Sequence, residues 1–276
     1  MNLKIEIHGT QLHFRTDNAE AAIYESADPF KPHFRRLRTA AGHSLVVCQP
    51  HDHVHHKGCF FGLATREFNF WEESALPSNP TPTGRQVSRS LQIETATGLE
   101  VGFAQNLRWE GSDGTPVFDE VRRVRVHATA GGFAWIWHTR WTSLRDNELA
   151  MSPWSMANAR GIKVNYHGLG FRLRRDFSGM GGNTVLLDAH ATSFADALGQ
   201  VPAAGVTYIG SIDEIHPAPR VALTLQQAQP GALFILENPF SWLSAGPSAL
   251  AAVPLPRGAI WEQTYTFTVA DATSAA

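Results

Sequence analysis

Cysteine is scarce in this chain, which has only Cys48 and Cys59 among 276 residues. Two cysteines cannot build a disulfide scaffold, and so small a number is typical of a reducing cytoplasm. Their positions on either side of a histidine run allow a redox or ligand role. Because free cysteine behaves as a small apolar residue, two buried thiols on strands are the favoured interpretation.

Charge of either sign is also sparse. Only 17% of the residues are charged, and the formal net charge is −2. The absence of a Lys/Arg run argues against a nucleic-acid partner. No apolar stretch approaches the roughly 20 residues that a membrane-spanning helix needs, and the first residues lack the apolar core of a secretion signal. We therefore predict a cytoplasmic protein, free to form a homo-oligomer, that binds a small molecule and neither nucleic acid nor a membrane.

Helical patterns are rare, and the dominant hydrophobic period is two. The four clearest alternating segments are 87–96, 99–111, 116–129 and 133–144. Alternation predicts strands, and the Gly-, Asp- and Pro-containing breaks between these segments predict an antiparallel meander. Residues 4–14 indicate an opening hairpin, residues 43–49 a short strand, and residues 192–200 one helical turn.

No Pro- or Ser-rich linker divides the chain. We therefore predict that residues 1–276 form a single all-β domain, a large antiparallel β-sandwich with two sheets stacked face to face. In the segment 133–144, Trp135 and Trp137 share one face while Ile136 and His138 take the other. Since both faces carry bulk, we expect this sheet to be covered on both sides or to line a cleft. Loops at the ends of such a sandwich usually carry the site.

The sequence PHDHVHHKG is the most unusual feature of the chain, because four histidines and one aspartate fall within six positions. In an extended strand His51, His53 and His55 would share one face, and Asp52 and His56 would point the other way. Imidazoles at this spacing suit a divalent first-row ion such as Zn²⁺ or Fe²⁺. Such a metal site would need further ligands from elsewhere in the chain. The available donors are Glu67, Glu72, Glu120, His138 and His167.

Acid–base chemistry is the rival hypothesis and the one that we favour. An imidazole beside a carboxylate can take or give a proton near neutral pH. Asp52 is the natural orienting partner for one of the rings, and His53, His55 and His56 are the candidate proton carriers. A polar loop tied together only by hydrogen bonds is the structural alternative.

Other residues are candidates for substrate contact. Glu120 and Arg122 lie two apart on a predicted strand and face the same way, so they form either a pair aimed at a substrate or a solvent-facing ion pair of little stabilising value. Arg172 suits a carboxylate or a hydroxyl-rich ligand. Trp242 could form a platform for a sugar or aryl ring, although a core tryptophan is the more common outcome. The other candidates are Lys57, Trp71, His138 and His167.

A longer stretch carries a family resemblance. The segment KPHFRRLRTAAGHSLVVCQPHDHVHHKGCFFGL, followed by FNFWEE, resembles a bacterial family usually called "methane oxygenase PmoA-like", whose pattern is Pro-x-Asp-His-x-His-His-x-Gly and then Phe-Trp. The matching residues are Pro50, Asp52, His53, His55, His56, Gly58, Phe70 and Trp71, with weaker matches at Gly84, Trp109, Glu120, Arg122, Gly168, Arg172, Pro239 and Trp242. A membrane oxygenase needs transmembrane helices, which this sequence lacks, so the resemblance does not imply oxygenase activity.

The resemblance implies a fold related to the galactose-mutarotase supersandwich. That superfamily includes sugar epimerases, carbohydrate lyases and hydrolases, which use His and carboxylate acid–base chemistry in a cleft on a concave sheet. Because a fold does not fix a function, this step is an analogy. The Trp-rich segments 138–144 and 151–160 depart from it and favour an aromatic substrate over a plain sugar.

Together these observations predict an enzyme of lyase or isomerase type that acts on a small hydroxylated sugar, glycoside or aryl compound. One of His53, His55 and His56 would abstract a proton, and another would return it or give it to a leaving group. Asp52 would set a tautomer, and Glu120 would assist. With an aryl substrate that bears a hydroxymethyl side chain, the same groups could drive a retro-aldol cleavage that releases formaldehyde.

Arg122 or Arg172 would stabilise negative charge that develops on a substrate oxygen. No cofactor is expected for this chemistry. One alternative is a metal-dependent hydrolase or oxygenase that holds Zn²⁺ or Fe²⁺ through His51, His53 and His55. Another is a non-catalytic carbohydrate-binding module.

Overall fold

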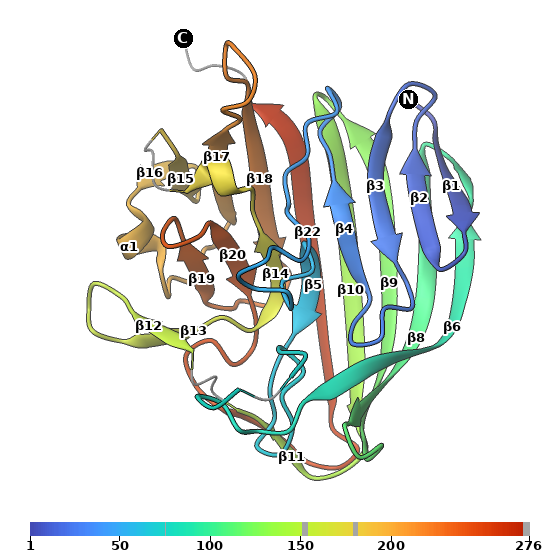
Figure 1. Cartoon of the computed structure of the whole chain (residues 1–276), viewed down its shortest axis with the longest axis vertical. Coiled ribbons are helices and arrows are strands. Elements are labelled where there is room, and N and C mark those ends of the chain that lie inside the picture. Colours follow the sequence, from blue (N-terminus) through green and yellow to red (C-terminus); the bar gives the residue numbers. More distant parts are fainter. Residues whose placement is uncertain (75, 151–153, 179–181, 273–276) are drawn as a thin grey trace.

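The computed structural model describes residues 1–74, 76–150, 154–178 and 182–272. Within these ranges two sheets of nine strands each pack face to face, and every pair of neighbouring strands is antiparallel (Figure 1). The predicted antiparallel β-sandwich is therefore confirmed. Residues 151–153 of the Trp-rich segment lie outside the described residues. No helix in the described part of the chain is long and apolar enough to span a bilayer.

The first sheet has the strand order β19-β20-β14-β5-β4-β3-β2-β1-β7. Its strands are β1 (Leu3–His8), β2 (Gln11–Arg15), β3 (Glu20–Glu25), β4 (His33–Leu37), β5 (Cys59–Gly62), β7 (Thr97–Gly98), β14 (Gly168–Arg172), β19 (Leu233–Leu236) and β20 (Trp242–Ala245). The predicted opening hairpin is confirmed as β1 and β2.

The second sheet has the order β16-β15-β17-β18-β22-β10-β9-β8-β6. Its strands are β6 (Gly84–Thr95), β8 (Glu100–Gly111), β9 (Pro116–Thr129), β10 (Gly132–Ser143), β15 (Thr184–Leu187), β16 (His190–Thr192), β17 (Val206–Ser211), β18 (Arg220–Gln227) and β22 (Ile260–Ala272). The predicted meander is confirmed as β6, β8, β9 and β10, which are neighbours in this sheet.

Short elements complete the chain. They are the ribbon of β11 (Asn147–Leu149) with β21 (Val253–Leu255), the ribbon of β12 (Ser155–Ala157) with β13 (Lys163–Asn165), the 3-10 turn η1 (Arg175–Phe177) and the helix α1 (Phe194–Ala197). The predicted helical turn is confirmed as α1. Its N-cap is Ser193, whose hydroxyl accepts a hydrogen bond from the Asp196 N–H at 3.0 Å.

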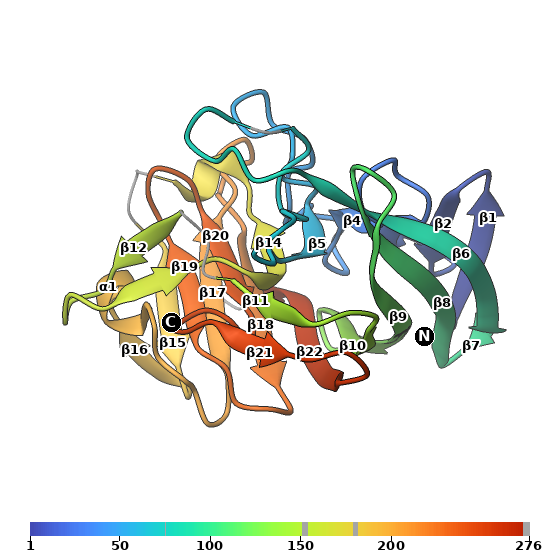
Figure 2. The ribbon, with the colours of Figure 1, turned by 90° about the horizontal axis from the view of Figure 1, so that it is seen from below.

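Two long loops flank β5 and position the site described below. They comprise residues 38–58 and 63–83, and they project from the same side of the first sheet (Figure 2). Residues 43–49 were expected to form a strand, but they make only isolated bridges, such as those of Val46 with Leu173 and Cys48 with Lys57. The first loop therefore follows an irregular path held by side-chain contacts.

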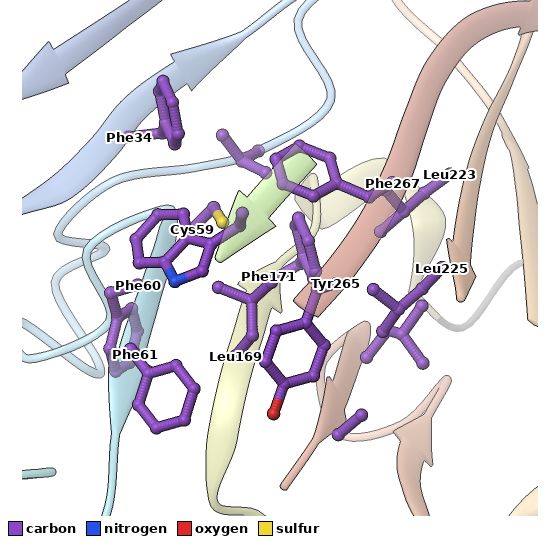
Figure 3. Packing of buried hydrophobic residues seen from close by; sticks show 14 of the residues in the cluster. Phe34, Cys59, Phe60, Phe61, Leu169, Phe171, Leu223, Leu225, Tyr265 and Phe267 are labelled. Carbon is purple, nitrogen blue, oxygen red and sulfur yellow. The ribbon is translucent and has the colours of Figure 1, made fainter. Parts of the chain in front are cut away.

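Aromatic side chains fill the space between the sheets. Phe34 of the first sheet packs edge-on against Trp135 of the second at 4.8 Å between ring centroids. Phe171 of β14 meets Phe267 of β22 at 5.0 Å (Figure 3). Fully burying one such side chain stabilises the fold by roughly 1.5–3 kcal/mol. The many rings of this core therefore fix the sheets, and with them the loops, relative to one another.

The outer face of β10 is not covered. Trp135 and Trp137 are fully buried on the inner face, whereas Ile136 and His138 are half-buried on the outer one. That outer face has a shallow groove of about 330 Å³, lined also by Arg123. The expectation that both faces of this sheet are covered is therefore wrong. The alternative expectation, that the sheet lines a cleft, agrees with the groove on its outer face.

The two cysteines are free thiols. Cys59 lies on β5 in the core, and burial raises its pKa well above the usual value (Figure 3). Cys48 is half-buried in the loop before β5, where it forms an isolated bridge with Lys57, and burial raises its pKa to about 11. Both thiols are therefore protonated at neutral pH. The expectation of a buried thiol on a strand is confirmed for Cys59 and is wrong for Cys48.

Candidate functional site

The histidine run forms a closed loop, here called the His loop (residues 49–57). The N–H of His53 donates to the Pro50 carbonyl at 3.0 Å, and the N–H of His56 donates to the His53 carbonyl at 2.9 Å. The N–H of Gln49 then donates to the His56 carbonyl at 2.7 Å and closes the loop. Two successive turns therefore replace the predicted extended strand, and the strict alternation of side chains expected for 51–56 is wrong.

The C-terminal end of the His loop is fixed by its last residue, Lys57, and by Gly58, which follows it. Gly58 has a φ of +78°, and a Cβ there would lie 2.4 Å from the carbonyl oxygen of Phe34, so only glycine fits. Lys57 is buried and donates to Asp28 and approaches Glu73, both at 3.1 Å. Lys57 therefore anchors the loop and does not line a pocket, which corrects its predicted role in substrate binding.

Three imidazoles of the loop gather in space. The rings of His53 and His56 stack at 4.7 Å with an interplanar angle of 19°, and His55 meets His56 edge-on at 4.5 Å. His51 lies apart from them, and its Nδ1 is 3.2 Å from Nη2 of Arg175. Among the described residues no three His, Cys, Asp or Glu side chains are arranged to hold a metal ion.

Asp52 ties the loop to the segment that follows β14. Its carboxylate accepts hydrogen bonds from Arg172 at 3.2 Å, from Arg175 at 2.5 Å and from Nδ1 of His53 at 3.0 Å. Burial raises the pKa of Asp52, but the hydrogen bond from His53 and the charges of the two arginines outweigh that effect and hold the pKa well below its usual range. Because an ionised carboxylate only accepts, Nδ1 of His53 carries a proton, and in the neutral ring the lone pair is therefore on Nε2.

Arg172 lies behind the histidines. Its guanidinium donates from Nη1 to Nδ1 of His56 at 3.1 Å and packs over the ring of Phe240 at 4.1 Å. Since a guanidinium only donates, the His56 proton is on Nε2, which is buried and has no hydrogen-bond partner among the residues that the structure describes. Burial and the charges of neighbouring groups, first His55 and then Arg172, lower the pKa of His56 well below its usual value. Arg172 therefore positions the His loop.

A pocket of about 330 Å³ opens beside the His loop. Its lining residues are His51, Asp52, His53, Val54, His55, Glu72, Ser74, Leu76, Trp154 and Tyr166. The loop thus supplies one part of the lining, and the second loop flanking β5, together with two aromatic residues, supplies the rest. The pocket is large enough for a small organic molecule.

Glu72 is the buried carboxylate of this pocket. Its Oε2 accepts from the amides of Asn69 at 2.6 Å and Asn79 at 3.0 Å, and its Oε1 accepts from the indole N–H of Trp154 at 2.7 Å. Within the described ranges no lysine, arginine or histidine nitrogen forms an ion pair with it. Glu72 is therefore a carboxylate held in place by neutral donors.

Three polar side chains of the pocket form no hydrogen bond with another described residue, namely His55, Tyr166 and Ser74. Burial, then the charge of Lys31 and of other nearby cations, lowers the pKa of His55 to about 3. Burial and the charge of Glu72 raise the pKa of Tyr166 above its usual value. At pH 7 the imidazole of His55 is therefore neutral, and the Tyr166 hydroxyl keeps its proton, so both can donate a hydrogen bond to a ligand.

Two of the predicted site residues lie in a sealed network between the sheets. Glu120 and Arg122 are fully buried, and Arg122 donates to both carboxylate oxygens of Glu120 at 2.8 and 2.9 Å. Thr139 and Trp109 donate to the same carboxylate. Both residues face inward from β9 and neither lines the pocket, so the catalytic role predicted for Glu120 and the substrate contact predicted for Arg122 are wrong.

Two predicted histidines also lie elsewhere. His138 is on the uncovered outer face of β10, where Nε2 is 2.8 Å from Glu262. His167 is buried, and Nδ1 is 2.9 Å from the hydroxyl of Ser248. The side chain of His138 lies on the outer face of the second sheet, and that of His167 is buried against Ser248. Neither side chain therefore lines the pocket beside the His loop.

Trp71 and Trp242 form an aromatic wall behind the His loop. Trp242 is buried with its ring 4.8 Å from His56, and Trp71 packs against Tyr166 at 4.9 Å. Neither ring lines the pocket. The prediction that Trp242 forms a platform for the substrate is therefore wrong, and its ring packs in the core. The rings stiffen the site from behind.

Sequence reasoning did not assign to this site Val54, Glu72, Ser74, Leu76, Trp154 or Tyr166, all of which line the pocket. Glu72 was named only as one of several possible metal ligands, and Tyr166 and Trp154 were not singled out for the site at all. The sequence offered two signals. Glu72 directly follows Trp71 in FWEE, and Tyr166 directly precedes His167 in NYH. Neither signal places these side chains beside residues about 20 and 110 positions earlier in the chain, because that depends on long-range packing.

Comparison with known proteins gives a family. Residues 10–276 match the model of a family of unknown function, DUF6807. No match was found among curated proteins. Among solved structures, the chain is similar to a mutant of the heparan sulfate lyase HepC from Pedobacter heparinus, with 10% identity and a TM-score of 0.40 over 99% of this chain and 37% of that one. It is also similar to a galactose mutarotase related enzyme from Lactobacillus acidophilus, with 9% identity and a TM-score of 0.38 over 99% of both chains.

Proposed function

Because this chain belongs to the DUF6807 family, whose function is unknown, we propose a function from its own site: an enzyme that performs acid–base chemistry on a small hydroxylated compound. The observation that carries the proposal is the pocket in which His53, His55, Glu72 and Tyr166 meet. Such a combination of titratable groups in a concave site is typical of proton-transfer enzymes. The reaction is of lyase or isomerase type, and the substrate is a sugar, glycoside or aryl compound.

His53 is the proposed general base. Its hydrogen bond to Asp52 fixes the tautomer, leaves the lone pair on Nε2 and stabilises the imidazolium that forms when the ring takes a proton. A base oriented in this way contributes roughly 10²–10⁴-fold to a rate. His55 and Tyr166 donate hydrogen bonds to substrate oxygens, and Glu72 accepts one from a hydroxyl group.

The pocket walls match a compound with both polar and apolar surface. Trp154, Val54 and Leu76 present apolar atoms, whereas Ser74 and Glu72 present acceptors. Hydroxylated rings have this mixed character, because their hydroxyl groups need acceptors and their ring faces pack against apolar atoms. A retro-aldol cleavage of an aryl compound and an epimerisation of a sugar both fit these walls. The cytoplasmic location expected from the sequence is part of the same proposal.

The test combines turnover with stability. Monosaccharides, methyl glycosides and hydroxymethyl-bearing phenols would be incubated with the full chain and followed by NMR. We expect His53→Ala to lower turnover at least roughly 100-fold at an unchanged melting temperature, and the matched control His190→Ala, an exposed histidine on β16, to leave turnover unchanged. A wild type that binds a sugar without any turnover would instead support a carbohydrate-binding module.

A further inference from the structure

The cations near the pocket are paired with carboxylates. Arg172 pairs with Asp52 at 3.2 Å, Lys57 pairs with Asp28 and Glu73 at 3.1 Å, and Lys31 lies 3.8 Å from Glu73. None of these three cations lines the pocket. The polar groups that a ligand meets there are therefore imidazoles, hydroxyl groups and the carboxyl groups of Asp52 and Glu72.

His55 lines the pocket. Its imidazole is neutral, and neither ring nitrogen hydrogen-bonds to another described residue, so the ring can donate one hydrogen bond into the pocket. A neutral imidazole that donates in this way is suited to an oxygen that gains negative charge during a reaction. It is poorly suited to protonating a leaving group, because it carries no proton to give up easily.

The donors of the pocket discriminate between two reaction classes. Glycoside cleavage passes through a transition state in which the sugar ring gains positive charge, and it needs a protonated acid. Neither the neutral His55 nor Tyr166, whose pKa is raised, gives up a proton easily. Removal of a proton next to a carbonyl group places negative charge on the carbonyl oxygen, which hydrogen bonds from these two pocket-lining donors stabilise.

We propose that the substrate is an α-hydroxycarbonyl compound and that the reaction passes through an enediolate whose oxygen is bound by His55. This inference rests on the proposed function and names its substrate class. Nε2 of His53 takes the proton from the carbon that bears the hydroxyl group. The C–H electron pair forms the new C=C bond, and the carbonyl π pair moves onto the oxygen, which accepts hydrogen bonds from His55 and Tyr166.

The proton then returns by one of two routes. Return to the same carbon from the opposite face gives an epimer. Return to the former carbonyl carbon, with the hydroxyl proton passing to the former carbonyl oxygen, gives the aldose–ketose isomer. Neither route needs an oxidant, a reductant or a co-reactant.

Glu72 holds the hydroxyl group of the substrate. A carboxylate has about four lone-pair positions, and the neutral donors Asn69, Asn79 and Trp154 occupy three of them. The position left over accepts a hydrogen bond from a substrate hydroxyl. Glu72 is therefore a binding residue that sets which carbon faces His53.

Acetohydroxamate is the first probe, since its planar, charge-delocalised group mimics an enediolate, and acetamide is its matched neutral control. Isothermal titration of the full chain at pH 7 is expected to show acetohydroxamate binding at least about 10-fold more tightly than acetamide, a difference of about 1.4 kcal/mol. We expect His55→Ala and Glu72→Gln to remove that preference. The surface variant Glu67→Gln, whose carboxylate pairs with exposed Arg145, is expected to keep it.

Dihydroxyacetone in D₂O is the second probe, and NMR is expected to show incorporation of solvent deuterium that His55→Ala abolishes. No preference for the hydroxamate in the wild type, or a preference that survives in a folded His55→Ala, overturns the inference. Turnover of glycosides or phenols that depends on His53, without deuterium exchange or hydroxamate binding, overturns the enediolate while leaving the proposed function standing. If neither probe binds and no compound is turned over, both proposals fail.

Discussion

Replacing Lys57 by Met tests whether the His loop is anchored by a buried ion pair. Lys57, Asp28 and Glu73 have side-chain exposures of 3%, 11% and 12%, so the pair belongs to the buried class and not to the surface class. Removing one partner of a buried pair costs about 3–5 kcal/mol. We expect the lower end, because Asp28 also accepts from the backbone N–H of Phe30 at 2.9 Å and Lys31 lies 3.8 Å from Glu73.

Urea unfolding of the full chain would measure this loss as a lower free energy of unfolding, about 3 kcal/mol. The matched control is Lys4→Met, which removes an exposed lysine 2.7 Å from Glu6 and is expected to cost less than about 1 kcal/mol. A Lys57→Met loss no larger than that of Lys4→Met would refute the anchoring role.

The pH dependence of the same variant provides a second check. Although burial raises the pKa of Asp28, backbone hydrogen bonds and the charge of Lys57 lower it overall. The stability that Asp28 contributes is therefore present above its unfolded pKa, about 4, and is lost as the pH falls. Loss of Lys57 raises the folded pKa of Asp28, so we expect the difference between wild type and variant to be largest near pH 7 and to narrow below about pH 4. A difference that is constant with pH would contradict the ion-pair account.

Three further predictions follow from the structure. Gly58→Ala forces a Cβ against the Phe34 carbonyl in left-handed backbone, so we expect it to lower the unfolding free energy by at least about 1–2 kcal/mol, and an unchanged urea midpoint would contradict this. Glu120→Gln leaves the buried Arg122 without its counter-charge, so we expect a loss of unfolding free energy of about 3–5 kcal/mol and no change in the proposed turnover by the folded protein; a fall in turnover at wild-type stability would restore a catalytic role for Glu120. Because the pKa of Asp52 is lowered, its contribution to the free energy of unfolding is present above about pH 4 and is lost as the pH falls. We therefore expect the free energy of unfolding of Asp52→Asn to fall less steeply below about pH 4 than that of the wild type. An equally steep fall in both proteins would count against the arginine contacts.

Much of the fold followed from the period of the sequence. Alternation in residues 133–144 predicted the buried face of Trp135 and Trp137, because side chains alternate across any strand. The same rule placed Glu120 and Arg122 together on one face, which is confirmed, but it could not tell which face turns inward. Both side chains are buried between the sheets, where they bind each other and cannot make the substrate contact that had been expected.

The site was only partly predictable. Crowded histidines marked a segment that lines the candidate pocket, and the expected contact of Asp52 with one ring is present as its hydrogen bond with His53. The turns that bend the loop depend on backbone hydrogen bonds and on the fit of Gly58 beneath a neighbouring strand, which no local pattern reveals. Glu72 and Tyr166 reach the pocket through contacts between distant segments, so they became visible only in three dimensions.

The central claim is that chemistry takes place in the pocket beside the His loop. The most direct measurement is a crystal structure of the full chain soaked with the compound that the NMR panel shows to be turned over, using His53→Ala to prevent reaction. The account predicts the compound between His55, Glu72 and Tyr166, with a carbonyl oxygen within hydrogen-bonding distance of His55. A compound bound instead in the groove on the outer face of β10, beside Arg123 and His138, would contradict it.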